Sequence, residues 1–594
     1  MPYIELHAAS AFSFLEAASL PESLVERAAD LGYPALALLD RDGVHGMPRF
    51  HKAAVAAGLR AIVGSEVTIR SGQWSVASGQ PVTRDPRATS HQPLATSHQP
   101  LATSHQPLAT SHQPLATSHQ PLATTFRLPV LIESAEGYRN LCRLLTRMNL
   151  RSPKGEGALA LEEFDGQATG MVALIGREAL RGGRHGVGGL LDRVVGIFGR
   201  PNVYVELQRH FLRDEESDNE ALGALASAFH VPVVATGGVR FAAPGDRPLY
   251  DVLTCIRHKT TLDAAGRKLA VNAERYLKPP GEIADLFRDL PEAVANTEAL
   301  ADRLRGTMAD IGYRFPEYPV PAGETMDSFL GRLTDAGARE RYRPYHDRAR
   351  AQIARELALI GKLKLSGYFL IVWDLVNFCR QQGILVQGRG SAANSAVCYS
   401  LGITAVDPVG MDLLFERFLS EERGEWPDID LDLPSGDRRE RVIQHVYEKY
   451  GPHGAAMTAS VITYRGRSAA REVGKALGID PGQVDRLSKV MHRFGFLDDG
   501  EGMAAHMEAA GVDSSQPRMR LFGELWERIQ DLPRHLGQHS GGMVICQGRL
   551  DGVVPLENAS MPGRVVVQWD KDDCADMGIV KIDLLGLGMM AALQ

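Results

Sequence analysis

Three aspartates alternate with aliphatic residues in the segment Trp426–Leu433, which reads Trp-Pro-Asp-Ile-Asp-Leu-Asp-Leu. Side chains two residues apart lie on the same face of a β-strand, so Asp428, Asp430 and Asp432 are expected to share one face. Carboxylates this close repel one another unless a cation lies between them, and oxygen ligands alone suit Mg²⁺ or Mn²⁺. The alternative is an edge strand with a solvated acidic face. Aspartate is a poor strand former, so we favour the metal site.

A further carboxylate lies much later in the chain, in the apolar segment Val580–Leu587. Lys581 and Asp583 are two residues apart, so on a strand they would lie on the same face. Taken alone, this pair is better explained as an isolated ion pair on the protein surface. It gains interest only if the fold places it beside the first group of aspartates.

The segment Val386–Ser395 has the form of a glycine turn that follows an apolar strand. Gly390 leaves its backbone N–H accessible and Ser391 adds a hydroxyl group, and both kinds of donor hold phosphate in proteins. The segment lacks the Gly-Lys-Ser/Thr ending of a Walker A loop. Arg417, shortly before the aspartate segment, contributes a cation.

Carboxylates for two metal ions, together with glycine N–H groups and cations for a polyphosphate, are the parts that phosphoryl transfer requires. One metal ion would lower the pKa of an attacking hydroxyl group, and the other would stabilise the leaving oxygen. Residue types and spacing alone therefore predict a Mg²⁺-dependent phosphoryl or nucleotidyl transferase.

The region up to about residue 295 alternates helix and strand signals, which favours an α/β layer or barrel. The predicted helix begins near Pro21 and is followed by apolar runs at Ala35–Leu39, Ala61–Val63 and Val231–Ala235. In such barrels chemistry occurs at the carboxyl ends of the strands. We expect Asp40 and Glu66 at these ends.

Residues 88–122 are five tandem copies of Ala-Thr-Ser-His-Gln-Pro-Leu. The proline in every copy excludes a continuous helix, and the low apolar content cannot build a core. A histidine-rich metal tract is one interpretation. We favour the expansion of a short DNA repeat within a surface loop, because no other type of metal ligand accompanies the histidines.

The secondary structure expected after residue 345 changes several times along the chain. The spacing of apolar residues predicts a helix over 346–364, strands and turns over 384–433, and mainly helix over 460–536. A β-rich stretch is expected over 542–583, with Val565–Val567 as its clearest strand.

Composition limits the class of protein. The chain has 594 residues, 44% of them apolar, with 65 basic and 72 acidic residues and a net charge of −7. This is a globular composition, and no apolar run reaches the length of about 18 residues that would suggest a membrane span. The N-terminus lacks the features of a secretory leader, and the six cysteines form no CxxC pair. We expect a cytoplasmic protein with reduced thiols and no membrane partner.

The order of these motifs resembles one family. Gly-Arg-Gly-Ser from Gly388, Leu-Leu-Phe-Glu-Arg-Phe-Leu from Leu413, Pro-Asp-Ile-Asp-Leu-Asp-Leu-Pro-Ser-Gly-Asp-Arg-Arg-Glu from Pro427 and Gln-Trp-Asp-Lys-Asp-Asp from Gln568 resemble the catalytic α subunit of bacterial replicative DNA polymerases, the C family. Glu5-Leu6-His7 and the segment after Leu433 resemble its error-prone branch. The resemblance covers essentially the whole chain except the repeats.

The resemblance implies a polymerase β-like nucleotidyltransferase palm with an inserted helical thumb. On this match Asp428, Asp430 and Asp583 hold two Mg²⁺ ions, or Mn²⁺, as the catalytic triad. Gly390, Ser391, Arg417 and Lys581 bind the triphosphate. The implied substrates are a primed DNA template and dNTPs, and Arg465, Arg467 and Arg471 in the thumb are candidates for contacts with the DNA backbone.

The N-terminal region resembles the PHP domain, a metal-binding phosphoesterase barrel, but four ligand positions of that pattern are lost. Ala9, Arg41, Gly238 and Arg240 stand where the pattern has metal ligands. His7, Asp40 and Glu66 remain, with His210 as a further candidate. Because two positions have become arginine, we expect no PHP metal cluster, no exonuclease activity and a structural role.

The resemblance also implies how the α/β multidomain chain is divided. The expected parts are a PHP-like domain (1–295, with 88–122 inserted), the palm (296–459 and 539–588), the thumb (460–538) and the start of truncated fingers (589–594). The family continues into fingers and segments that bind the sliding clamp and damage-response accessory proteins. One alternative is an inactive remnant without catalysis of its own, and another is a stand-alone PHP phosphoesterase, which the lost ligands disfavour.

Overall fold

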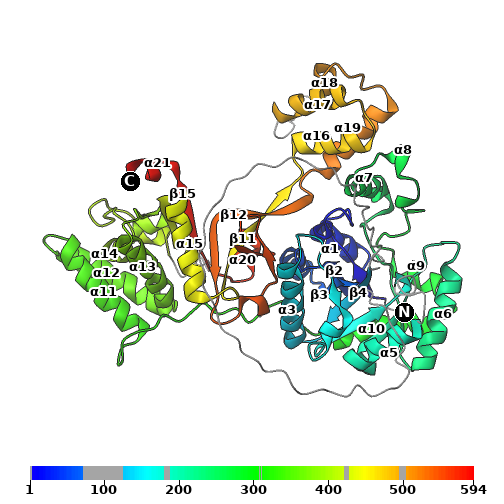
Figure 1. Ribbon diagram of the computed structural model, residues 1–594, viewed down its shortest axis with the longest axis horizontal. Helices are drawn as coiled ribbons and strands as arrows, with labels where there is room; N and C mark the ends of the chain where they lie inside the picture. The colour runs from blue at the N-terminus through cyan, green and yellow to red at the C-terminus, as the bar shows by residue number, and fades with distance from the viewer. Residues whose placement is uncertain are drawn as a thin grey trace, which may run out of the picture.

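The computed structural model describes residues 3–70, 125–178, 187–306, 308–309, 311–419, 427–493 and 503–594. The heptapeptide repeats and Trp426 lie outside this part of the chain. Figure 1 shows two lobes, one with the N-terminus and one with the C-terminus, joined by the long strands β11 and β12. Within the described residues, no helix has both the length and the apolar content needed to cross a bilayer.

The N-terminal lobe is built on an eight-stranded sheet in the order β1-β2-β3-β4-β6-β7-β8, with β5 paired to β3. Its strands are β1 (Glu5–Ala8), β2 (Ala35–Arg41), β3 (Arg60–Arg70), β4 (Thr125–Ile132), β5 (Leu159–Ala160), β6 (Met171–Ile175), β7 (Val203–Leu207) and β8 (Val233–Ala235). β4 runs antiparallel to both neighbours, and the other adjacent pairs are parallel. The N–H of Val239 donates to the carbonyl of His7, so the segment after β8 returns to β1.

Helices cover this sheet because its strands are apolar on both faces, as in β2, where the first six residues are buried. The helices of this lobe are α1 (Pro21–Asp30), α2 (Met47–Ala56), α3 (Ala135–Arg151), α5 (Val187–Phe198), α6 (Glu215–Phe229), α7 (Arg247–His258), α8 (Leu262–Ala265), α9 (Pro280–Leu286) and α10 (Pro291–Arg303). The three predicted apolar strands are confirmed. The placement of Glu66 at a strand end is wrong, because β3 continues to Arg70 in its pairing with β4.

The second lobe combines helices with a seven-stranded sheet in the order β13-β14-β11-β12-β15-β10-β9. Its strands are β9 (Gln387–Arg389), β10 (Asp430–Pro434), β11 (Ala455–Thr463), β12 (Pro533–Ile545), β13 (Leu556–Asn558), β14 (Val565–Val567) and β15 (Lys581–Leu587). Its helices are α11 (Met326–Arg341), α12 (Asp347–Lys362), α13 (Ser366–Gln381), α14 (Ala396–Ser400), α15 (Asp437–Tyr450), α20 (Lys571–Asp576) and α21 (Gly588–Leu593). The predicted helix over 346–364 and the strand Val565–Val567 are confirmed.

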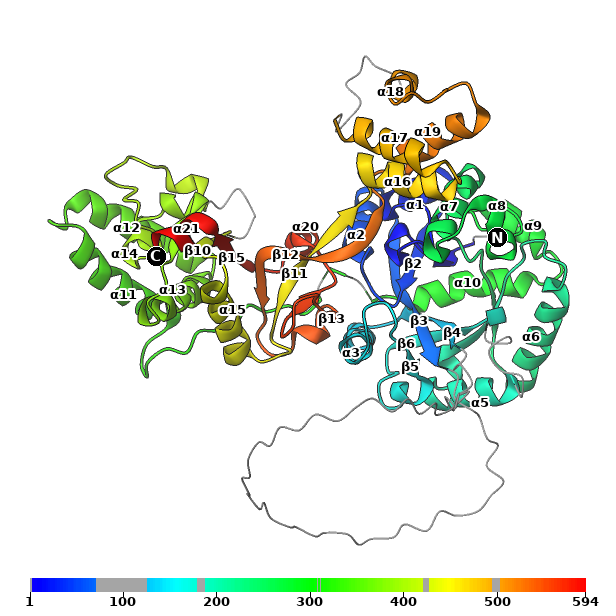
Figure 2. The ribbon, with the colours of Figure 1, turned by 45° about the horizontal axis from the view of Figure 1, so that its top comes forward.

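A separate helical unit is inserted between β11 and β12. It comprises α16 (Gly466–Ala476), α17 (Pro481–Arg493), α18 (Met503–Ala509) and α19 (Pro517–Ile529). Figure 2 shows it at the far end of the β11–β12 ribbon, beside α7 of the N-terminal lobe. The helical prediction over 460–536 holds for the middle of that range. Its two ends are strand instead, because Ile462 pairs with His535 in the antiparallel ladder.

The two lobes share buried contacts at the junction formed by β13, β14 and α3. Trp569 is fully buried, and its indole N–H donates to the carbonyl of Val44 at 3.0 Å. The side-chain oxygen of Gln568 accepts from the N–H of Val44 at 2.9 Å. One hydrophobic core runs through this junction. The six cysteines are all buried and unpaired, as expected.

Replacing Trp569 by alanine is expected to lower the free energy of unfolding by about 3–5 kcal/mol, because the loss of a buried indole leaves a cavity between the lobes. Urea unfolding monitored by circular dichroism measures this change. Trp569→Phe is the matched control: it keeps most of the apolar volume and should cost markedly less. If Trp569→Ala were as stable as the parent, burial of this indole between the two lobes would not stabilise the fold.

Candidate active site

The first group of functional side chains is created by the parallel pairing of β10 with β15. In this register Asp430 is directly opposite Asp583, and Asp428 lies two residues before Asp430. One carboxylate oxygen from each of these three aspartates lies within 4.8 Å of the others. In the described part of the chain this is the one group of three His, Cys, Asp or Glu side chains with such geometry.

The Lys581 ammonium group lies among these carboxylates. Its Nζ is 2.8 Å from both carboxylate oxygens of Asp428 and 2.7 Å from Oδ2 of Asp583. The expectation that Lys581 and Asp583 share a strand face is therefore confirmed. The second oxygen of Asp583, Oδ1, is buried and has no hydrogen-bond partner. A divalent cation that prefers oxygen ligands fits this set of donors.

Asp430 is strongly affected by its neighbours. Burial, followed by the negative charges of Asp428 and Asp583, raises the pKa of Asp430 to about 6. Both causes act against the ionised form, which a bound cation would instead stabilise. The negative charge gathered at Asp428, Asp430 and Asp583 therefore favours the binding of a cation.

A pH dependence of metal binding follows from this shift. Metal ions bind the deprotonated carboxylate, so lowering the pH through about 6 protonates Asp430 and should weaken Mn²⁺ binding by up to about tenfold per pH unit. Above about pH 7 the affinity should level off. Titration of Mn²⁺ followed by electron paramagnetic resonance between pH 5 and 8 measures this, and a constant affinity across that range would refute it.

Asp432 does not join this group of three carboxylates, although the alternation placed it on the same face as Asp430. Its Oδ2 is 3.2 Å from Nε of Arg389, which β9 holds opposite this part of β10. Asp428 also differs from the expectation in one respect. It precedes the first strand residue, because β9 pairs only with residues 430–432.

The glycine turn lies next to the aspartates because β9 is the neighbour of β10. Gly390 has a φ of 66°, which favours glycine, and the Ser391 hydroxyl donates to the carbonyl of Asp428 at 2.9 Å. Gly390, Ser391 and Arg417 line one open cavity of about 490 Å³, together with Asn394 and Glu416. The structure therefore places three of the four residues predicted to bind phosphate around one cavity, while Lys581 lies among the aspartates.

Two further charged or polar side chains also lie here. Arg389 faces Asp430 and Asp432 across the β9–β10 pair. His539, on β12, has its Nδ1 3.9 Å from Oδ1 of Asp583. The signal for His539 in the sequence is weak: a histidine shortly before two adjacent glycines and the apolar residues Met543–Ile545.

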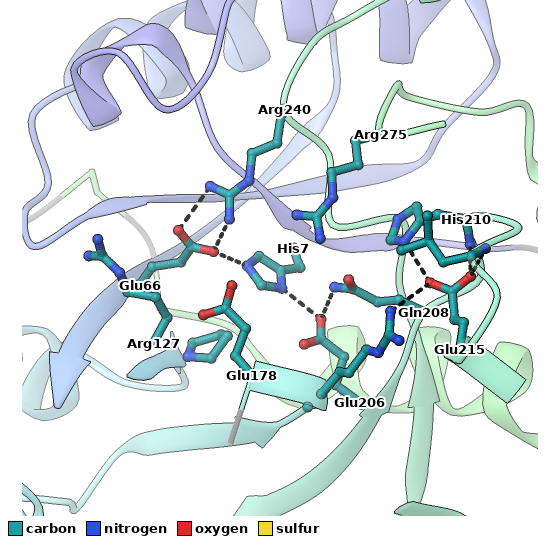
Figure 3. Close-up of a pocket in the computed structure, with 14 residues that line it drawn as sticks. His7, Glu66, Arg127, Glu178, Glu206, Gln208, His210, Glu215, Arg240 and Arg275 are labelled. Carbon is teal, nitrogen blue, oxygen red and sulfur yellow. Dashed lines mark hydrogen bonds and ion pairs between the residues drawn. The ribbon is translucent and has the colours of Figure 1, made fainter. Parts of the chain in front are cut away.

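A second cluster of charged groups occupies a cavity of about 100 Å³ in the N-terminal lobe, shown in Figure 3. His7 lies between two carboxylates: its Nε2 is 2.6 Å from Glu66 and its Nδ1 is 2.6 Å from Glu206. Although burial favours the neutral ring, Glu206 and Glu66 raise the pKa of His7 to about 10. The Arg240 guanidinium binds both oxygens of Glu66, at 2.5 and 2.9 Å.

These residues do not fit a metal cluster of the PHP type. Both ring nitrogens of His7 donate to carboxylates, and both oxygens of Glu66 are already engaged by Arg240. Asp40 lies at the carboxyl end of β2, as predicted, but neither Asp40 nor Arg41 joins this cluster. Asp40 accepts hydrogen bonds from Ser10 and Gly46 and does not line this cavity. Arg41 pairs with Glu16 and does not line the cavity either.

Comparison with known proteins matches both the region that contains the three aspartates and the region that contains the His7 cluster to protein families. The family description "PHP domain" matches residues 5–210, and "Bacterial DNA polymerase III alpha NTPase domain" matches residues 328–586, which include all three aspartates. The chain belongs to the bacterial DNA polymerase III α family. Its N-terminal lobe is the PHP domain, and the lobe with the aspartates is the polymerase III α region.

Curated relatives align along the entire chain. An error-prone DNA polymerase of Mycolicibacterium paratuberculosis is 42% identical over 605 residues, and one of Anaeromyxobacter sp. (strain K) is 39% identical over 679. The chain spans 50% and 55% of their respective lengths. The match to a solved amidohydrolase structure from Chromobacterium violaceum covers 40% of this chain and 87% of the amidohydrolase chain, with 14% sequence identity. Its TM-score of 0.23 is too low to identify the fold.

Proposed function

We propose that the protein is a DNA-directed DNA polymerase of the error-prone, translesion type, which adds dNTPs to the 3′ end of a primer. The observation that carries this proposal is the meeting of Asp428, Asp430 and Asp583 on neighbouring strands, beside a glycine turn and two cations. Membership of the polymerase III α family supports the choice of nucleotidyl transfer over other phosphoryl-transfer reactions.

Each part of the site has a role in this reaction. Asp428, Asp430 and Asp583 would hold two Mg²⁺ ions, with Mn²⁺ as a substitute. When bound, these ions supply the charge that activates the primer hydroxyl and stabilises the leaving oxygen. Lys581 and Arg417 offer positive charge to the triphosphate, while Gly390 and Ser391 line the same cavity as Arg417. The chain's residues thus mainly position the reactants.

The domain assignment is part of the same proposal. The seven-stranded sheet would be a polymerase β-like palm, and helices α16–α19 the inserted thumb. Of the three arginines proposed to contact the DNA backbone, Arg465 pairs with Asp531 at 2.5 Å and Arg471 lies 3.9 Å from Asp485. Binding DNA phosphates would therefore exchange these exposed pairs for new ones, at small cost.

The PHP domain is proposed to act structurally, since its charged groups pair with one another rather than present metal ligands. The sliding clamp and the damage-response accessory proteins are proposed partners for the longer family members. Primed DNA and dNTPs are the proposed substrates of the site itself.

Primer extension on a primed DNA template with Mg²⁺ and dNTPs tests the proposal. Extension by this chain would establish a working polymerase site within these 594 residues. If the chain binds Mg²⁺ at the aspartates but extends no primer, the alternative of an inactive remnant is the better description. Hydrolysis of phosphoesters that is lost on changing His7 would instead favour a PHP phosphoesterase.

A further inference from the structure

Strand β12 contains a bulge where it passes Asp583. On one side β12 pairs with β11 at Met543 and again at Gln538, and the intervening segment takes five residue steps against two on β11. On the other side Gly542 is directly opposite Asp583. Bulges of this kind redirect side chains and are frequent beside active sites.

His539 holds the backbone of this bulge. Its Nδ1 accepts hydrogen bonds from the N–H groups of Gly541 and Gly542, at 3.2 and 2.7 Å. Because two donors point at Nδ1, this nitrogen is the acceptor, and the proton of the neutral ring is assigned to Nε2. In the described part of the chain, the Nε2–H group has no hydrogen-bond partner, and the side chain is 21% exposed.

The two glycines allow the bulge to approach the metal-binding group closely. A Cβ atom on Gly542 would lie 2.3 Å from the Thr458 hydroxyl and 3.1 Å from Oδ1 of Asp583. A Cβ atom on Gly541 would lie 2.5 Å from a methyl group of Leu585. Side chains at these positions would push the bulge away. Its geometry is therefore specified by the sequence, which keeps the imidazole of His539 beside Asp583.

We propose that His539 is a phosphate-binding residue of this site, whose Nε2–H group donates a hydrogen bond to a phosphate oxygen bound beside Asp583. The proposal rests on the proposed polymerase function and adds a residue to it. The phosphate can belong to the incoming dNTP or to the DNA backbone, since both present the same anionic oxygens. A neutral imidazole N–H held in one orientation suits such an acceptor.

Two substitutions separate the two ring nitrogens. His539→Asn places an amide oxygen near the position of Nδ1, so it can still accept from the glycine N–H groups, but it lacks a donor at the Nε2 position. His539→Gln keeps a donor near Nε2 and loses the acceptor at Nδ1. The affinities of both variants for a Mg²⁺-bound, non-hydrolysable dATP analogue and for primed DNA should be measured against the parent.

We expect His539→Asn to weaken binding about tenfold, the loss typical of one hydrogen bond to a charged group, and His539→Gln to stay within about threefold of the parent. Weaker binding of the dATP analogue would assign the contact to the nucleotide, and weaker binding of DNA would assign it to the backbone. The proposal is overturned if His539→Asn binds both ligands as the parent does, or if His539→Gln loses as much.

The melting temperatures of the two variants test whether His539 only stabilises the bulge. Loss of the Nδ1 acceptor should lower the melting temperature of His539→Gln more than that of His539→Asn. If ligand affinity follows this same order, His539 acts only through the backbone, and the proposal fails. Asp430→Asn distinguishes failure of the wider function: analogue binding that does not change in that variant would count against the metal site rather than against His539 alone.

Discussion

Replacing Asp430 by asparagine is expected to reduce primer extension by about three orders of magnitude or more while the protein remains folded. Asp430 is one of the three aspartates whose carboxylate oxygens lie within 4.8 Å of one another, and it is paired in register with Asp583. Loss of one metal-binding carboxylate removes several kcal/mol of transition-state stabilisation, and each 1.36 kcal/mol corresponds to a factor of about ten in rate.

The matched control is Asp432→Asn, because Asp432 has the same chemistry two residues further along the same strand. Its carboxylate pairs with Arg389 and lies outside the group formed by Asp428, Asp430 and Asp583. We expect this variant to extend primers at a rate within a few-fold of the parent. Extension by Asp430→Asn at the parental rate, or an equal loss in both variants, would remove the basis for assigning the metal ions to these three aspartates.

Replacing Arg240 by alanine is expected to lower the free energy of unfolding by about 3–5 kcal/mol, although Arg240 does not belong to the group of three aspartates. Both partners of its ion pair are buried, with side-chain exposures of 8% for Arg240 and 2% for Glu66. Removing one member of a buried pair leaves an uncompensated charge, and this is the origin of the large cost. Denaturant unfolding at pH 7 measures it.

Two controls make this result specific. Arg41→Ala removes a partly exposed arginine that pairs with Glu16 and should cost about 1 kcal/mol or less. The double variant Arg240→Ala/Glu66→Gln removes both charges and should recover part of the lost stability. If Zn²⁺ or Mn²⁺ raised the melting temperature of the Arg240→Ala variant to that of the parent, the cavity would be a metal site after all.

Only part of the group formed by Asp428, Asp430 and Asp583 can be predicted from local sequence patterns. Alternation along 428–432 places the aspartates on one face, but spacing alone leaves open which of them act together. The choice of Asp428 and Asp430 comes from the family resemblance. In the structure, the grouping of Asp428 and Asp430 with Asp583 depends on the parallel pairing of β10 with β15, two segments that are distant in the chain. The same pairing places Lys581 among the carboxylates.

Other features could not be read from local patterns for physical reasons. The role of His539 depends on a bulge, and the bulge depends on how β12 is paired with both β11 and β15. Glu66 lies within a strand because β3 is extended by β4, whose sequence follows the heptapeptide repeats. Asp40 accepts from Ser10 and Gly46, contacts that no periodicity predicts.

The central claim is that Asp428, Asp430 and Asp583 hold the divalent ions of a nucleotidyl transferase. The most direct measurement is anomalous X-ray diffraction from crystals of the chain soaked with Mn²⁺ and a non-hydrolysable dNTP. Manganese between these three carboxylates, with the Lys581 ammonium group displaced toward the phosphates, is the predicted result. Absence of manganese there, or its presence only beside His7 and Glu66, would contradict the account.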